Sequence, residues 1–394
     1  MRRPWITLAA VSTVFFLITA TTFSSLGVVL PAMIGELHWS WGGAGSGFSL
    51  LGVAAGITAT IPASLIRRFG VRITLAVGSL VMAAAFACLA LTHGLLLYFL
   101  GCLLMGLGFT LLATVPGTYL LARLFANPSF AFGLYFTVGG LGGVAGPVLY
   151  LWVAGLTQNW RAYWLVSLAI VLAAGLLSAV LVNVDSDVRG ASGSDPDITK
   201  EEWPVKAALR TPQFAVLAAA YSIFLFVGIT VNAVSVAHLM GRGIPAAVAG
   251  GMMSAEALVN AGARLAGGVI VRWIDAKTLL LLSLAMLIGG LVALSAAHDM
   301  PLMLLYALGV GVGYGLTFFA STILLLDYFG RGPNLELFAA INLISTVGAG
   351  GPAFAGFVAD HTGSFVPAFT ILEVLVAMVL VAVIVMRRPQ RRAA

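Results

Sequence analysis

The sequence predicts an all-α membrane protein whose twelve transmembrane helices form two pseudo-symmetric six-helix halves. Hydrophobic residues make up 61% of the 394-residue chain and charged residues only 9%, a balance that no soluble domain keeps without large apolar surface patches. Twelve apolar runs are each long enough to cross about 30 Å of hydrocarbon. An internal repeat relates the first six runs to the last six.

The apolar runs follow one another along the whole chain. They lie near residues 5–32, 44–66, 73–92, 94–122, 130–154, 162–183, 213–239, 247–271, 278–296, 301–328, 336–358 and 367–386. The first is longer than a signal-peptide core, so we expect an uncleaved first span. Residues 184–212 are rich in Asp, Ser, Gly and Pro, which is typical of a polar linker. We therefore expect an N-terminal half at 1–183, a linker at 184–212 and a C-terminal half at 213–394.

Basic residues predict the orientation of these spans. If the first end lies in the cytoplasm, all but three of the 20 Lys and Arg residues fall on the cytoplasmic side, the exceptions being Arg161, Arg242 and Arg264. The positive-inside rule then places both termini and the linker in the cytoplasm. The net charge of +6 is explained by this topology and gives no reason to expect a nucleic-acid partner.

Three local patterns recur at one offset. Arg67 and Arg72 return as Arg272 and Lys277, the glycines at 106 and 108 return at 311 and 313, and the Gly-Pro pair at 146–147 returns at 351–352. Every pair is 205 residues apart (272 − 67). Two like halves around a central site are the architecture of alternating-access transporters.

The eighth apolar run contains three polar residues in SAEALVNAGARLAGG, at 254–268. Glu256, Asn260 and Arg264 are spaced four residues apart, so neighbours share a helix face, whereas Glu256 and Arg264 are separated by about 12 Å of rise. Their repeat mates are Leu51, Ala55 and Ala59, so folding alone does not require the polar groups. Charged residues within spans usually mark a functional site.

Arg264 and Asn260 are the main candidates for substrate binding, because a guanidinium binds a carboxylate through two parallel hydrogen bonds. The alternative for Arg264 is an internal ion pair, for example with Glu373 in the last run, and for Asn260 an interhelical hydrogen bond. Glu256 and Glu373 are candidates for proton coupling; for Glu256 the alternative is a position in a water-filled vestibule. Polar or aromatic residues midway along other spans complete the binding candidates: Tyr135, Thr118, Asn232, Tyr314 and Asn342.

The twelve spans, the repeat, the mid-chain loop and the basic turns make the whole chain resemble the major facilitator superfamily. The loop signature of that family, G-x-x-x-D-R-x-G-R, is partly present in ASLIRRFGVR at 63–72, where Arg67 replaces the acidic residue. The resemblance implies a cytoplasmic gate at this loop. Because the acid is missing, we expect Asp327 and Glu336, which flank the turn between the tenth and eleventh runs, to meet Arg67 or Arg68.

Within the superfamily, the pair Asn260-x-x-x-Arg264 resembles the monocarboxylate transporters and the oxalate/formate antiporter group, in which an Arg of this helix binds the substrate carboxylate. The Gly-rich segments 106–125 and 133–147 are weaker similarities to that group. The first and eleventh spans carry no further basic residue, so the resemblance favours a monocarboxylate over a dicarboxylate.

The sequence thus predicts a secondary active transporter of small organic anions, with a monocarboxylate favoured, working by alternating access with proton symport or anion exchange. The alternative is a drug or metabolite efflux antiporter of the same superfamily. A channel or receptor fits the repeat less well, and no nucleophile–base pair or metal-spaced ligand set predicts an enzyme. We expect a monomer in the inner (plasma) membrane whose partners are the anion, a proton or counter-anion and the bilayer, without a cofactor, a metal or nucleic acid.

Overall fold

A computed structural model describes residues 2–125, 128–182, 203–271, 273–330 and 334–389. Across these ranges every regular element is a helix. The N-terminal group comprises α1 (Arg2–Thr21), α2 (Phe23–Leu37), α3 (Trp41–Ile57), the 3-10 helix η1 (Thr58–Thr60), α4 (Ile61–Ala90), α5 (Leu95–Leu112), α6 (Thr114–Leu124), α7 (Pro128–Thr157) and α8 (Trp160–Leu181).

The C-terminal group begins after the expected linker. It comprises α9 (Val205–Leu209), α10 (Pro212–Gly241), α11 (Ala246–Ile270), α12 (Ala276–Ala296), α13 (Met300–Phe329), α14 (Asn334–Ser345), the 3-10 helix η2 (Thr346–Gly350), α15 (Gly351–Thr362) and α16 (Val366–Val385). Residues 184–202 of the linker lie outside the described residues, and the short helix α9 lies in its remainder.

Ten stretches of the described residues are long and apolar enough to cross a membrane. One of them, Trp41–Ala90, is 50 residues long and includes a break at Gly70, whose φ of 83° lies in a region that favours glycine. If this stretch is divided in two and α11 is added, the structure is compatible with the twelve spans expected. The three polar residues of α11 lower its hydropathy. The protein is therefore an all-helical, multi-pass membrane protein.

Several of the expected spans are broken helices. The first divides into α1 and α2 at Thr22, the fourth into α5 and α6 at Ala113, and the eleventh into α14 and α15 at η2. At Ala113 the backbone carbonyl accepts a hydrogen bond of 2.8 Å from the Tyr135 hydroxyl, beside a longer one of 3.4 Å from the Gly117 N–H. A side chain thus supplements a long backbone hydrogen bond at the break, where lipid offers no partner.

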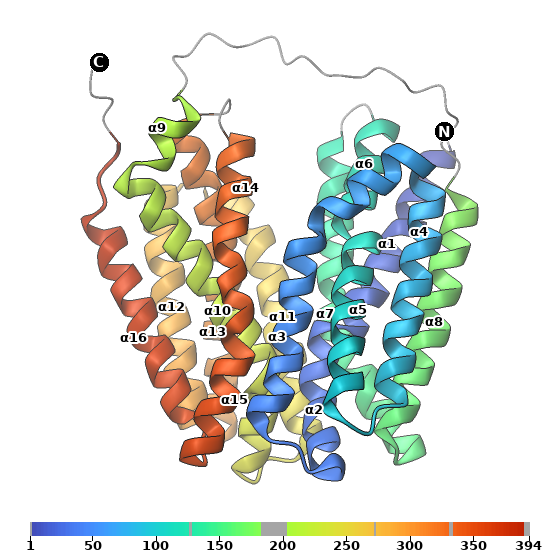
Figure 1. Ribbon diagram of the computed structural model, residues 1–394. Helices are drawn as coiled ribbons and strands as arrows, with labels where there is room; N and C mark the ends of the chain where they lie inside the picture. The colour runs from blue at the N-terminus through green and yellow to red at the C-terminus, as the bar shows by residue number, and fades with distance from the viewer. Residues whose placement is uncertain (1, 126–127, 183–202, 272, 331–333, 390–394) are drawn as a thin grey trace.

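The two groups of helices lie side by side, with both termini at one end of the bundle (Figure 1). We call this the near end and the opposite one the far end. The groups pack together through α3 with α15, α7 with α11 and α2 with α10. Toward the near end their ribbons diverge (Figure 1).

The internal repeat appears as matching contacts in the two groups. A Cβ on Gly106 would collide with the Leu51 carbonyl, and one on Gly311 with the Glu256 carbonyl, so both glycines permit the same close helix approach. Leu51 and Glu256 are themselves 205 residues apart (256 − 51). The equivalence of the halves therefore extends from sequence to packing.

Arg72 and its repeat mate Lys277 have the same structural role in the two groups. Arg72 donates from Nε to the carbonyl of Ala179 at 3.1 Å, and Lys277 donates from Nζ to the carbonyl of Ile384 at 3.0 Å. These carbonyls belong to the last turns of α8 and α16, where a cation favours the negative end of a helix. The two side chains thus cap the final helix of each group.

Candidate functional site

Arg264 and Asn260 meet on one face of α11. The Arg264 Nε donates a hydrogen bond of 3.0 Å to the Asn260 Oδ1, which the spacing of four residues permits. Neither Nη group donates to another described residue, and Arg264 takes part in none of the ion pairs formed by the described residues. The side chain is exposed. The outer edge of the guanidinium, formed by the two Nη groups, is thus open to a ligand.

Two aromatic rings of α13 lie beside this guanidinium. Its central carbon lies 4.9 Å from the ring centre of Phe318 and 5.7 Å from that of Tyr314, both on α13. These distances are within the range of cation–π attraction. The Phe318 ring contacts Tyr221 of α10 at a centroid distance of 6.0 Å, and the Tyr221 hydroxyl is 3.5 Å from the Asn342 Oδ1 of α14. A chain of contacts thus links Arg264 of α11 to α13, α10 and α14.

Glu256 lies two turns along α11 from Arg264 and is only 5% exposed. It faces α13, where Tyr306 and Tyr314 are its titratable neighbours, and the charge of Arg264 also acts on it. It forms no ion pair with a described residue. This buried position differs from the water-filled vestibule considered as the alternative.

Glu373 is placed differently. Its Oε1 accepts a hydrogen bond of 3.0 Å from the Ser295 hydroxyl of α12. It does not pair with Arg264, so the internal ion pair considered as the alternative for Arg264 is absent among the described residues. This finding leaves the guanidinium without an acidic partner in the part of the chain described.

The other binding candidates divide between the site and the scaffold. Tyr314 lies beside Arg264, whereas Asn342 is linked to it through Tyr221 and Phe318. Tyr135 is fully buried, stacks on Phe15 at 4.8 Å and bonds the carbonyl at the α5–α6 break. Thr118 donates to the Val115 carbonyl of its own helix at 3.2 Å. The Asn232 side chain donates to the Gly228 carbonyl at 2.9 Å. The backbone carbonyl of Asn232 lies against Gly27 of α2, where the two groups of helices meet.

The expected gate residues lie at the near end and are all exposed. Arg67 donates to the Ser64 hydroxyl at 3.3 Å. Arg67, Arg68, Asp327 and Glu336 form no ion pair with one another in the described structure. Because the groups diverge at this end (Figure 1), a contact among these four residues stays a prediction for a conformation in which the near end is closed.

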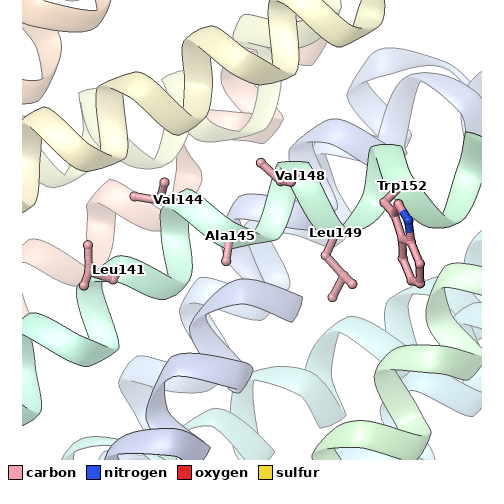
Figure 2. A pocket seen from close by; sticks show the side chains of 6 residues that line it. All are labelled: Leu141, Val144, Ala145, Val148, Leu149 and Trp152. Atoms are coloured by element: carbon pink, nitrogen blue, oxygen red, sulfur yellow. The ribbon is translucent and has the colours of Figure 1, made fainter.

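An apolar hollow runs along α7, with a volume of about 500 Å³. Figure 2 shows its six lining side chains, Leu141, Val144, Ala145, Val148, Leu149 and Trp152, all on this one helix. Val148 is 57% and Trp152 62% exposed. Apart from the indole nitrogen these side chains carry no polar group, so the hollow suits hydrocarbon and not a charged substrate.

Sequence reasoning missed Tyr221 and Phe318. Phe318 follows Tyr314 by four residues, so both rings lie on one face of α13, and this spacing is a signal that was present in the sequence. Tyr221 left no comparable signal, because its place beside Asn342 depends on how α10 packs against α14.

Comparison with known families decides the identity of this fold. The model of the Major Facilitator Superfamily matches residues 12–350. The chain belongs to the Major Facilitator Superfamily. A comparison with the curated proteins found no match.

Solved structures of other transporters have the same fold. The chain is similar to the nucleoside transporter NupG, at 15% identity over 98% of each chain with a TM-score of 0.78. It is also similar to a bacterial homologue of the human lysosomal transporter Spinster in an inward-facing and unoccupied conformation, at 14% identity over 97% of this chain and 95% of that one, with a TM-score of 0.73. At these identities the likeness concerns the fold alone.

Membership of the Major Facilitator Superfamily makes the protein a membrane transporter and not an enzyme. The matching model describes the superfamily as a whole. The narrower resemblance to monocarboxylate carriers rests on the Asn260–Arg264 pair of α11 and on the Gly-rich segments 106–125 and 133–147.

Proposed function

We propose that the protein is a secondary active transporter of small organic anions, with a monocarboxylate as the favoured substrate and Arg264 as its receptor. One observation supports this most strongly. Arg264 is held by Asn260 through Nε, its Nη groups donate no hydrogen bond to a described residue, and it lacks an acidic partner among the described residues. An unpaired cation in a membrane span is costly, and two parallel Nη–H···O bonds to a carboxylate offset that cost.

The rings beside Arg264 favour the shape of this substrate. Phe318, Tyr314 and Tyr221 present apolar surface next to the charged group. A carboxylate with an apolar body uses both features, whereas sulfate or phosphate uses only the charge. A single guanidinium matches one carboxylate better than two.

Transport in this proposal proceeds by alternating access in the inner (plasma) membrane, with a monomer as the working unit. The positive-inside pattern supports cytoplasmic termini, so the near end is the cytoplasmic end. The groups pack at the far end and diverge at the near end (Figure 1), which corresponds to an inward-facing state.

Glu256 is our candidate for proton coupling. It is a buried carboxyl on the same helix as Arg264 and has no ion-pair partner in the described structure. A carboxyl in such a place can load a proton on one side and release it on the other when the carrier changes state. Glu373, which Ser295 engages, is the second candidate. Exchange against another anion is the alternative, because Arg264 alone suffices for it.

A second candidate is export of a drug or an uncharged metabolite. The cluster of Tyr221, Phe224, Tyr314, Phe318 and Phe338 favours it, because aromatic walls stack planar compounds. The fold is shared with a nucleoside transporter. In this case Arg264 is a cation–π partner of the walls and not an anion receptor.

A thermal-shift binding screen with the purified protein separates these proposals. The panel comprises lactate, pyruvate, formate, oxalate and aromatic acids at two pH values, with uridine and a lipophilic cation as non-carboxylate probes. Stabilisation by one or more monocarboxylates, lost in Arg264→Lys and kept in Arg242→Lys, supports the proposal. Stabilisation by the non-carboxylate probes alone, equal in both variants, overturns it in favour of the second candidate.

A further inference from the structure

A carboxylate links the two groups of helices at the far end. Asp360, in the last turn of α15, accepts a hydrogen bond of 2.8 Å from the backbone N–H of Trp41 and another of 2.8 Å from that of Gly42. Each of its oxygens takes one bond. The donors are the first two residues of α3, 318 and 319 positions away in the other group.

These bonds complete the first turn of α3. The N–H groups of a first turn have no partner within the helix. Ser40, the N-cap residue, supplies one by accepting from the Gly43 N–H at 3.0 Å. Asp360, from the opposite group, accepts from the two N–H groups before it, those of Trp41 and Gly42. A carboxylate at a helix N-terminus also favours the positive end of the helix dipole, and bonds to it are charge-assisted.

Close packing around Asp360 ties these bonds to closure of the far end. Gly45 of α3 lies against the carbonyl of Pro352, and Gly356 of α15 lies against the carbonyl of Trp41. The Trp41 ring meets Phe365 edge to face at 5.1 Å. The carboxylate reaches the α3 N-terminus only while the two helices are this close. Opening of the far end separates α3 from α15 and breaks both hydrogen bonds.

The internal repeat shows that the fold does not require this acid. The equivalent seam joins α7 to α11, and the repeat mate of Asp360 there is Gly155 (360 − 205). That seam also packs closely: a Cβ on Gly250 of α11 would lie 3.1 Å from the Leu151 side chain of α7, and further along the Ser254 hydroxyl donates to the Val144 carbonyl at 2.8 Å. This seam therefore packs closely without such a carboxylate among the described residues, and Asp360 adds two hydrogen bonds that only the far-end-closed state can contain.

We infer that Asp360 is a latch that favours the far-end-closed state and thereby sets the balance between the two states of the transport cycle. The latch is independent of the substrate. It follows from the superfamily fold and from hydrogen bonds that cross between the groups, so it stands whether the cargo is a carboxylate or an uncharged compound.

Distance measurement by pulsed EPR between two nitroxide labels on the full-length protein tests the latch. Nitroxide labels at His93→Cys and Ala247→Cys, two exposed far-end positions in opposite groups, report far-end opening in a background with Cys88→Ala and Cys102→Ala. Asp360→Ala should raise the ratio of far-end-open to far-end-closed molecules by roughly three- to thirtyfold. Asp360→Asn keeps one acceptor oxygen and should give a smaller rise in the same direction.

Asp299→Ala is the matched control. Asp299 is also an exposed far-end carboxylate at a helix N-terminus, but it accepts from Leu302 of its own group at 3.0 Å, so its loss should leave the distance distribution unchanged. The latch is overturned if Asp360→Asn, folded by its melting temperature, gives the parent's distribution, or if Asp299→Ala shifts it as far as Asp360→Ala does.

Discussion

Arg264→Lys probes the proposed receptor while keeping its positive charge. In the structure the Nε bond to Asn260 sets the orientation of the guanidinium, and the two Nη groups together form the open edge. A Lys ammonium is a point charge that cannot bind both carboxylate oxygens in this planar geometry. Losing one charge-assisted hydrogen bond of about 1.5–3 kcal/mol predicts a fall in apparent affinity of roughly 10- to 150-fold.

The assay is uptake of a labelled monocarboxylate into proteoliposomes, with substrate concentration varied to separate KM from the maximal rate. The loss should appear as a raised KM. Arg242→Lys is the control, because Arg242 donates to the Ala297 carbonyl at 3.2 Å at the far end and Lys retains a donor there. Uptake by Arg264→Lys within threefold of the parent, at equal insertion and melting temperature, would refute the receptor role.

Three further predictions concern coupling, gating and stability. Glu256→Gln should abolish uptake driven by a pH gradient yet keep exchange of labelled for unlabelled substrate; equal loss of both would exclude a proton-coupling role. Arg68→Glu should lower uptake by up to about fivefold, as expected for an exposed ion pair, and adding Asp327→Arg should restore it, whereas additive losses would contradict the gate. Asp275 caps α12 by accepting the Thr278 N–H at 3.0 Å, a bond that, with the bond from the Thr278 hydroxyl, lowers the pKa of Asp275. Asp275→Ala should cost about 1 kcal/mol of stability. This deficit should be fully present above about pH 4, where an unfolded Asp is ionised, and should disappear as the pH falls through the lower pKa of folded Asp275. A melting-temperature deficit that does not change with pH would count against this cap.

Much of the fold follows from hydropathy and the repeat. The apolar runs correspond to helices because a span must satisfy its own backbone in lipid, and the equivalence of Arg72 with Lys277 was readable at one offset before either was seen to cap a helix. The breaks at Thr22 and Ala113 were not foreseen. Each lies inside a continuous apolar run, so composition gives no sign of it. A side chain from another helix, such as the Tyr135 hydroxyl, supports the backbone there, and such a partner is known only from the structure.

The sequence by itself determined that Arg264 and Asn260 share a helix face and that the opposite half lacks them, because helical periodicity and the repeat are local or one-dimensional properties. Only the tertiary structure decided what surrounds them. Tyr221 and Phe318 come from separate helices, and Asp360 meets Trp41 across 319 positions. Most faces of a span in lipid are apolar, so hydropathy alone carries little signal for which face meets which neighbour. That choice is made by the packing of small residues and by polar groups seeking partners, which exist only once the helices have come together.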